Sequence, residues 1–117
     1  MGYSLILLGI GLVAKYKGDF KFSRENLGNV LPLFQEMGDI QRVTMIQSEF
    51  GHMERYEGHL DKAEQVYHET IPVWQKLGHR AAVANQLECL AFRVALWQLS
   101  RRLSMRWRIH RLTDFEI

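Results

Sequence analysis

The chain has 117 residues, of which 47% are hydrophobic and 24% are charged, and its formal net charge is +2. This composition is ordinary for one folded domain and excludes a disordered chain. A charge of +2 is too small to indicate a polyanionic partner by itself. The single cysteine, Cys89, cannot form an internal disulfide. The sequence therefore predicts a reducing compartment, the cytoplasm.

The first segment is an apolar run from Leu5 to Ala14. It is about half the length of roughly 20 residues that a membrane-spanning helix needs, and no basic region precedes it. We therefore expect a buried helix here. Because its middle is apolar all round, this helix must be covered on more than one side.

Two arrangements would cover such a terminal helix: further repeats upstream, or a second copy of the chain. We favour self-association through Ile6, Leu8 and Leu12, and hence a homo-oligomer. The alternative is that the helix simply packs back on Phe20 and Leu27.

The chain repeats itself with a period of forty residues, and four glycines stand one every twenty. The identical pairs are Ile6 and Ile46, Gly11 and Gly51, Tyr16 and Tyr56, Gly18 and Gly58, Pro32 and Pro72, Gln35 and Gln75, Gly38 and Gly78, and Val43 and Val83. A period of this length is typical of units that bury their apolar faces by stacking on their neighbours.

Apolar residues between the glycines recur at helical spacing, and each glycine stands where a helix should end in a left-handed cap. We therefore predict paired helices joined by tight turns. The expected ranges are Tyr3 to Lys17, Asp19 to Met37, Asp39 to Glu57, His59 to Leu77, His79 to Gln98 and Leu99 to Leu112. Pro32 and Pro72 fall at the same place in two helices, where we expect kinks that curve them.

The paired helices resemble the tetratricopeptide repeat family. The first helix of that family carries a Leu-Gly-type pair, matched here by Ile10-Gly11, Phe50-Gly51 and Leu90-Ala91. Its second helix carries Ala and then an aromatic residue four positions on, matched by Ala63 and Tyr67 and more weakly by Ser23 and Leu27. The small residue lets the two helices approach closely, so Gly51→Leu should force them apart.

Units of forty residues are longer than the usual 34. Phrases such as Leu33 to Asp39 and Trp74 to His79 are similar to the longer variety found in maltose-regulator-like bacterial transcription activators and related signalling ATPases. The resemblance implies an all-α, right-handed α-solenoid of about three helix-turn-helix repeats in a single domain, 1–117, with repeats at about 1–38, 39–78 and 79–112. Gln98 stands where a glycine is expected, so the third unit is degraded or capped.

The resemblance also implies that the first helices line a concave face. The positions expected to be exposed there, and to form a groove for a peptide, are Met45, Ser48, His52, Arg55, Asn85, Glu88 and Phe92. Basic and apolar side chains together suit an extended peptide or a helix with an acidic group and an apolar anchor. The alternative is an ordinary solvated surface.

The segment from Leu99 to Arg111 holds five arginines among apolar residues. We interpret it as the solvated side of a capping helix, so that nucleic acid is not expected as a partner. The alternative is a basic amphipathic element for nucleic acid or for an anionic membrane surface.

The five histidines are scattered, with no two of them at metal-ligand spacing, and the single cysteine cannot form a ligand pair with another. Glu64 and His68 lie four apart on one helix, which favours a stabilising pair over an acid-base dyad. We therefore expect no enzyme, metal or cofactor. The sequence predicts a protein-interaction scaffold, a piece of a bacterial signalling or regulatory protein. The alternative is a regulatory domain that senses a small effector between its helices.

Overall fold

The computed structural model describes the backbone of residues 2–113 and, within them, every side chain except those of 93, 96, 97 and 104–113. Over the described residues the chain is all-helical, with no strand. The helices are α1 (Gly2–Tyr16), α2 (Phe20–Met37), α3 (Ile40–Tyr56), α4 (Leu60–Leu77) and α5 (Arg80–Thr113). The boundaries of the first four agree with the predicted ones to within one residue.

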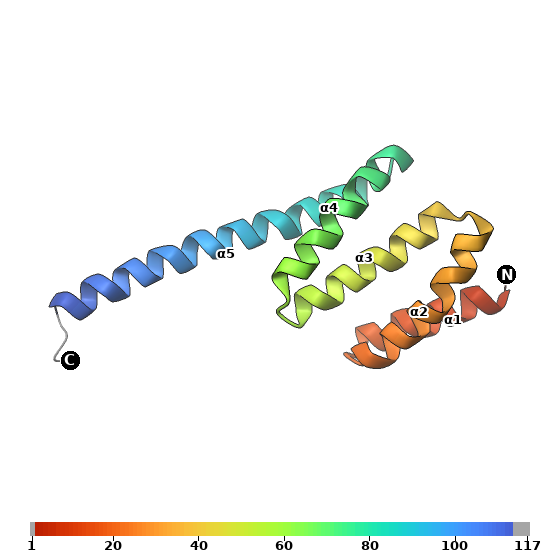
Figure 1. Cartoon of the computed structure of the whole chain (residues 1–117), viewed down its shortest axis with the longest axis horizontal. Helices are drawn as coiled ribbons and strands as arrows, with labels where there is room; N and C mark the ends of the chain where they lie inside the picture. Colours follow the sequence, from red (N-terminus) through yellow and green to blue (C-terminus); the bar gives the residue numbers. More distant parts are fainter. Residues whose placement is uncertain (1, 114–117) are drawn as a thin grey trace.

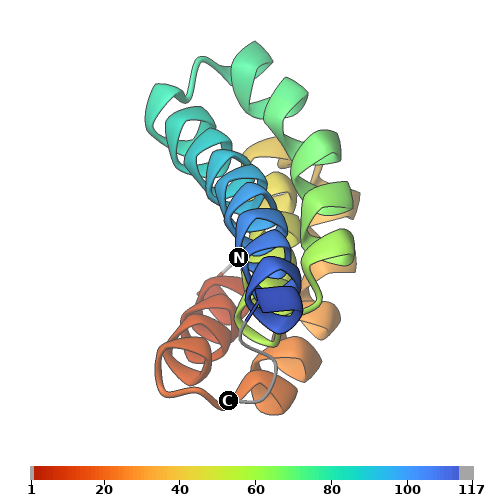
Figure 2. The ribbon, with the colours of Figure 1, turned by 90° about the vertical axis from the view of Figure 1, so that its left-hand side faces the viewer.

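Each helix packs against the next one in the chain, so that α1 pairs with α2, α2 with α3, α3 with α4, and α4 with α5. The molecule is elongated, with extents of 66 × 30 × 18 Å. Figure 1 shows α2 bending along its length and α5 projecting well beyond the other helices. In the end view of Figure 2, α5 points towards the viewer, with α1 on one side of it and α4 on the other.

The turns between helices follow from their glycines and aspartates. Gly38 and Gly78 end α2 and α4 in the left-handed conformation, with φ of 69° and 74°. Asp19 caps α2 by accepting from the backbone N–H of Phe22 at 3.1 Å. Asp39 caps α3 in the same way. These caps satisfy backbone groups that would otherwise be unpaired at the helix ends.

The forty-residue period reappears as a period in side-chain environment. The residues that α2 buries at regular spacing are Ser23, Leu27, Val30 and Phe34, and those that α4 buries at the same offsets are Ala63, Tyr67, Thr70 and Trp74. Residues one period apart therefore occupy matching positions in α1–α2 and in α3–α4.

Close approach of paired helices depends on two glycines one period apart. A Cβ built on Gly11 would lie 2.8 Å from Cδ2 of Leu27, and one built on Gly51 would lie 2.8 Å from Cγ1 of Val66. Both distances are shorter than a normal van der Waals contact. The predicted role of Gly51 in the approach of α3 and α4 fits this geometry.

The prediction of separate helices on either side of Gln98 is wrong, because α5 runs without interruption from Arg80 to Thr113. The other turns each have a glycine with positive φ, whereas Gln98 would be strained in that conformation. A chain of good helix formers without a breaker continues as a helix. Within residues 2–113 no helix therefore follows α5 and folds back on it as α2 and α4 fold back on the helices before them.

The junction of α3 with the preceding hairpin is apolar. Its buried side chains come from α1, α2 and α3 and are Leu8, Leu27, Val30, Phe34, Ile46 and Met53. Five of these residues are fully buried, and Val43, Met45 and Phe50 pack against them. Burial of this surface holds the first three helices together.

The junction of α5 with the hairpin before it is polar at its centre. Thr70 donates to the side-chain oxygen of Gln86 at 2.6 Å, and Gln86 donates from Nε2 to Oγ of Ser48 at 2.7 Å. Trp74 donates from Nε1 to the same Oγ at 3.0 Å. All four side chains are buried. The network joins α3, α4 and α5 with each group paired.

Candidate interaction surfaces

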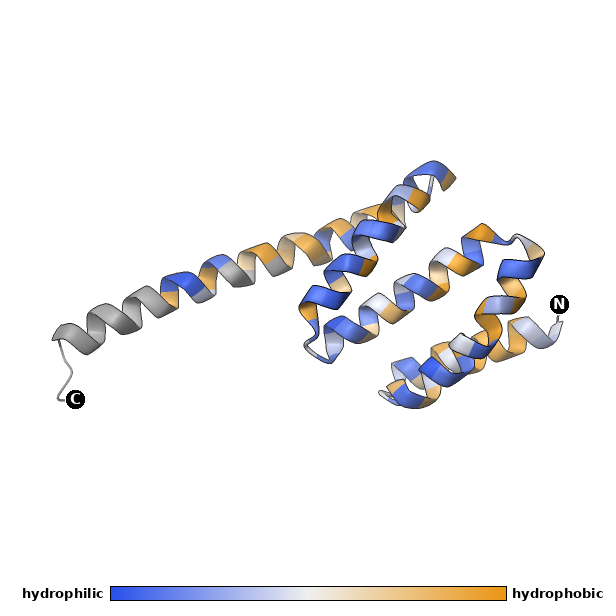
Figure 3. Cartoon of the chain, in the orientation of Figure 1, coloured by the Kyte–Doolittle hydropathy of each residue, from blue (hydrophilic) through white to orange (hydrophobic). Residues whose placement is uncertain are grey.

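The outer face of α1 exposes large apolar side chains. Ile6 is 64% exposed and Val13 is 53% exposed, with Ile10 also exposed between them. Phe22, at the start of α2, adds an exposed ring beside them. These four side chains with Gly9 line an open cavity of about 610 Å³. Figure 3 shows the apolar colouring of α1 at the N-terminal end of the molecule. We call this set of side chains the α1 face.

The period explains what the α1 face would contact in a longer array. Ile6 corresponds to Ile46 and Val13 to Met53, and both of those α3 residues are completely buried in the apolar junction with the preceding hairpin. The α1 face therefore corresponds to the side of α3 that packs on the preceding hairpin, α1–α2.

The three residues predicted to mediate self-association lie in different environments. Ile6 is exposed, Leu8 is 6% exposed inside the first apolar cluster, and Leu12 is half-buried against that cluster. The assignment of Leu8 to an outer surface is wrong, because its side of α1 is the side that packs on α2. The periodicity of a helix that is apolar all round does not show which side faces inwards.

The groove predicted in the second repeat is largely closed. Ser48 is buried in the polar network, and Met45 packs against the first apolar cluster. His52 and Arg55 are half-buried. The expectation that all four are exposed is therefore wrong for Ser48 and only partly met for the others. In the third repeat Asn85, Glu88 and Phe92 are exposed as expected.

His52 is held by α4. Its Nδ1 lies 2.7 Å from the hydroxyl of Tyr67, and the two rings are 5.4 Å apart at their centroids. Burial lowers the pKa of His52 below its ordinary 6.5, with the nearby charge of Glu49 acting in the opposite direction. Burial also raises the pKa of Tyr67. His52 is thus a neutral part of the helix contact at pH 7 and not a free binding group.

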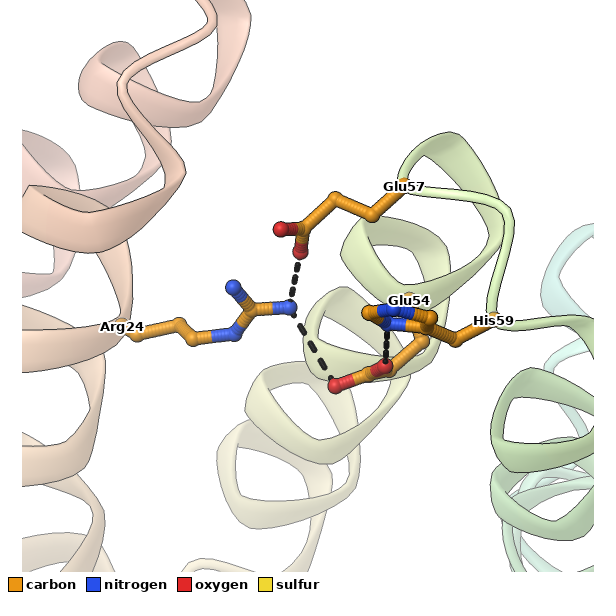
Figure 4. A network of polar contacts seen from close by, with 4 residues as sticks. All are labelled: Arg24, Glu54, Glu57 and His59. Atoms are coloured by element: carbon orange, nitrogen blue, oxygen red, sulfur yellow. Dashed lines mark hydrogen bonds and ion pairs between the residues drawn. The ribbon is translucent and has the colours of Figure 1, made fainter.

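The two ionic contacts between the first hairpin and α3 differ in burial. Lys15 of α1 pairs with Glu49 of α3, and the side chains are 8% and 16% exposed. Figure 4 shows Arg24 of α2 reaching Glu57 and Glu54, while His59 bonds to the other oxygen of Glu54. The hydrogen bond with Arg24 lowers the pKa of Glu57.

Arg55 lies one period after Lys15, and Cys89 lies one period after Glu49. The residue of α5 that corresponds to Glu49 is therefore a thiol, so Arg55 has no carboxylate at that position. Its Nε is buried without a hydrogen-bond partner among the described residues. Arg55, Tyr67 and Cys89 border a cavity of about 10 Å³, which is room for about one water molecule. This site between helices is too small for an effector.

The described residues contain no cluster of three or more His, Cys, Asp or Glu side chains that could hold a metal ion. Glu64 and His68 lie 3.5 Å apart on the surface of α4, in the arrangement of a helix-stabilising pair. Among the described residues no helix is both long enough and apolar enough to cross a membrane.

Comparison of the chain with protein-family models, with curated proteins and with solved structures finds no match.

Proposed function

We propose that the chain is a non-catalytic protein-interaction scaffold, built as a right-handed α-solenoid of tetratricopeptide-like repeats, that binds an amphipathic helix of a protein partner on the α1 face. The proposal includes a bacterial regulatory system in the cytoplasm as its setting, and the sequence resemblance to regulator and signalling proteins supports that part. Self-association is part of the proposal. One observation carries the binding function: the apolar α1 face is exposed where its counterpart on α3 is covered.

The type of partner that fits the α1 face can be inferred from what covers the corresponding face of α3. On α3 the corresponding face is covered by the preceding hairpin, of which α2 presents Leu27, Val30 and Phe34 to the junction. A helix with an apolar stripe at this spacing fits the same type of face. Phe22 and the open cavity beside Ile10 offer a place for one large side chain as an anchor. The partner is therefore an amphipathic helix with a bulky apolar residue.

A synthetic peptide with the sequence of residues 20–37 is a defined probe, because it is the helix that covers the corresponding face of α3. We expect saturable binding of the fluorescently labelled peptide in anisotropy titrations with the intact chain. Ile6→Glu and Ile10→Glu should each weaken binding at least tenfold, since a charge would be placed in an apolar contact. Gln75→Glu, at an exposed position on α4, is the matched control.

The proposal is contradicted if the peptide does not bind, or if both α1 variants bind it as well as the unmodified chain does. Ile6 and Ile10 are exposed, so unchanged helical circular dichroism should confirm that the variants fold.

The cavity against α1 favours a second candidate, an effector-sensing domain that binds a small molecule. About 610 Å³ is within the usual volume of small-molecule sites, and a lining that is apolar except for Lys17 and Asp19 suits a mainly apolar ligand. Thermal stabilisation by a small apolar metabolite, lost in Ile10→Glu, together with absence of helix binding would favour this function over the scaffold.

A further inference from the structure

One face of the described part of α5 is exposed. The corresponding face is covered on α1 and on α3, the first helices of the two hairpins. On α1 the residues of this face are Ser4, Leu7, Gly11 and Ala14, of which three are buried and Leu7 is half-buried. The residues eighty positions later on α5 are Ala84, Leu87, Ala91 and Val94, and all four are exposed. Leu87 is 49% exposed and Val94 is 54% exposed. We call these four residues the α5 stripe.

The α5 stripe is bare because its covering helix is absent from the described fold. α2 folds back on α1 and α4 folds back on α3, each antiparallel after a short glycine turn. At Gln98 there is no such turn, and α5 continues to Thr113. Ala91 occupies the place of Gly11 and Gly51, at which the covering helix approaches closely. The precedent of α2 and α4 therefore favours an antiparallel helix as the partner in this position.

We infer that the occupant is α5 of a second copy of the chain, packed antiparallel about a twofold axis at the level of Cys89. In this register Ala84 lies opposite Val94 of the second copy. Leu87 lies opposite Ala91 of the second copy. Each large side chain thus faces a small one, which is the complementarity that two closely packed helices need. The symmetry makes every contact occur twice.

The charges of the described residues agree with this pairing. Within the contact Glu88 falls opposite Leu90 of the second copy, and Arg80 falls opposite Gln98 of the second copy. No two like charges face one another along the α5 stripe. The carboxylate of Glu88 lies at the edge of the stripe, where it stays in contact with water.

The size of the contact sets its strength. The paired segments from Arg80 to Gln98 are about 28 Å long at 1.5 Å per residue. One helix face of this length is at the low end of the surface in stable interfaces, which bury about 800 Å² on each partner. The dimer should therefore dissociate on dilution. This inference gives a surface to the proposed self-association and is independent of helix binding on the α1 face.

Sedimentation velocity of the intact chain over a dilution series tests the inference. We expect a concentration-dependent shift from dimer to monomer. Leu87→Glu and Ala91→Glu should each weaken the dimer at least tenfold. Asn85→Glu is the matched control, because Asn85 is exposed on the same helix about 160° from Leu87. All of these side chains are exposed in the single chain, so unchanged circular dichroism should show that the variants fold.

Exchange of the two central residues tests the register. Ala91→Leu alone places leucine opposite leucine and should weaken the dimer, whereas Leu87→Ala combined with Ala91→Leu restores one large residue opposite one small residue. The double variant should regain most of the affinity.

Cysteine variants in a Cys89→Ser background give a second readout. A mixture of Leu87→Cys and Ala91→Cys chains should form a disulfide-linked dimer under oxidation, and each variant alone should not.

A chain that stays monomeric at every concentration, or a dimer that neither glutamate variant weakens, would overturn the inference. A dimer lost in Ile6→Glu but kept in Leu87→Glu would place the contact on the α1 face and overturn it as well. Loss of peptide binding with the dimer intact would contradict only the proposed helix-binding function.

Discussion

Gln86 on α5 donates a hydrogen bond from Nε2 to Oγ of Ser48 on α3, 2.7 Å away, inside a buried contact. One period earlier the corresponding residues are Ile46 and Leu8, which belong to a single apolar cluster. Corresponding positions thus form an apolar cluster in the first junction and a hydrogen-bonded network in the second. A buried hydrogen-bonded network requires specific partners, so the hairpins are not interchangeable.

Removal of Gln86 should be costly because each of its two hydroxyl partners loses a buried hydrogen bond. In Gln86→Ala the hydroxyls of Thr70 and Ser48 lose a partner while buried. We expect the free energy of unfolding to fall by about 2–3 kcal/mol, which urea denaturation would measure. A loss within experimental error would show that water reaches the junction.

Conversion of the second junction into a copy of the first is a stricter test. The four changes are Ser48→Leu, Thr70→Val, Trp74→Phe and Gln86→Ile, which reproduce the residues one period earlier. Replacing all partners of a buried network by apolar groups of fitting shape is often neutral or stabilising. We expect the fourfold variant to be at least as stable as the unmodified chain in the same urea assay. A strong loss would mean that the two junctions differ in shape.

Glycines in different environments should respond oppositely to alanine. In Gly51→Ala the new Cβ would meet Cγ1 of Val66 at 2.8 Å and Cε1 of Tyr67 at 3.2 Å, and a stiff β-branched side chain yields poorly. We expect a loss of about 1–3 kcal/mol in the free energy of unfolding. Gly28→Ala on α2 meets no atom within 4 Å and should gain about 0.5–1 kcal/mol by restricting the unfolded chain.

Local signals predicted the helices well. The glycine turns at Gly18, Gly38, Gly58 and Gly78 and the forty-residue period were enough to place the first four helices, because a glycine with positive φ is a local requirement of each turn. The end of α5 was missed because the prediction relied on the period where the sequence had lost its glycine.

Surface positions were harder to predict than helices. The environment of a side chain depends on which helices cover it, and a helix such as α1, which is apolar all round, contains no sign of that. The family resemblance puts Ser48 in an exposed groove, and the sequence does not reveal its buried partner Gln86, which is distant along the chain and replaces the apolar Ile46 of the preceding junction. The bare faces of α1 and α5 became visible only when residues one or two periods apart could be compared in exposure.

Stability should fall on mild acidification because of His52. Burial lowers the pKa of His52 in the folded chain, while the unfolded chain keeps about 6.5. As the pH falls through 6.5, the unfolded chain binds a proton that the folded chain does not, so the unfolded state is favoured. Thermal unfolding at pH 7.5 and 5.5 should show a lower Tm at the acidic pH. His52→Gln should reduce this difference, whereas His68→Gln, an exposed control, should not.

The two ionic contacts between the first hairpin and α3 should differ in their response to substitution and to salt. Glu49→Gln leaves the ammonium of Lys15 without its counter-charge at an 8% exposed site, and we expect a loss of about 3 kcal/mol that salt hardly changes. Arg24→Gln removes a third-exposed guanidinium, so its smaller effect should shrink further in high salt. Urea unfolding at low and high sodium chloride measures both.

If Lys15→Met combined with Glu49→Leu matches the unmodified chain while Glu49→Gln does not, the cost in the single variant arises from the unpaired buried charge. Equal losses in the single and double variants would instead assign a net stabilising role to the ion pair.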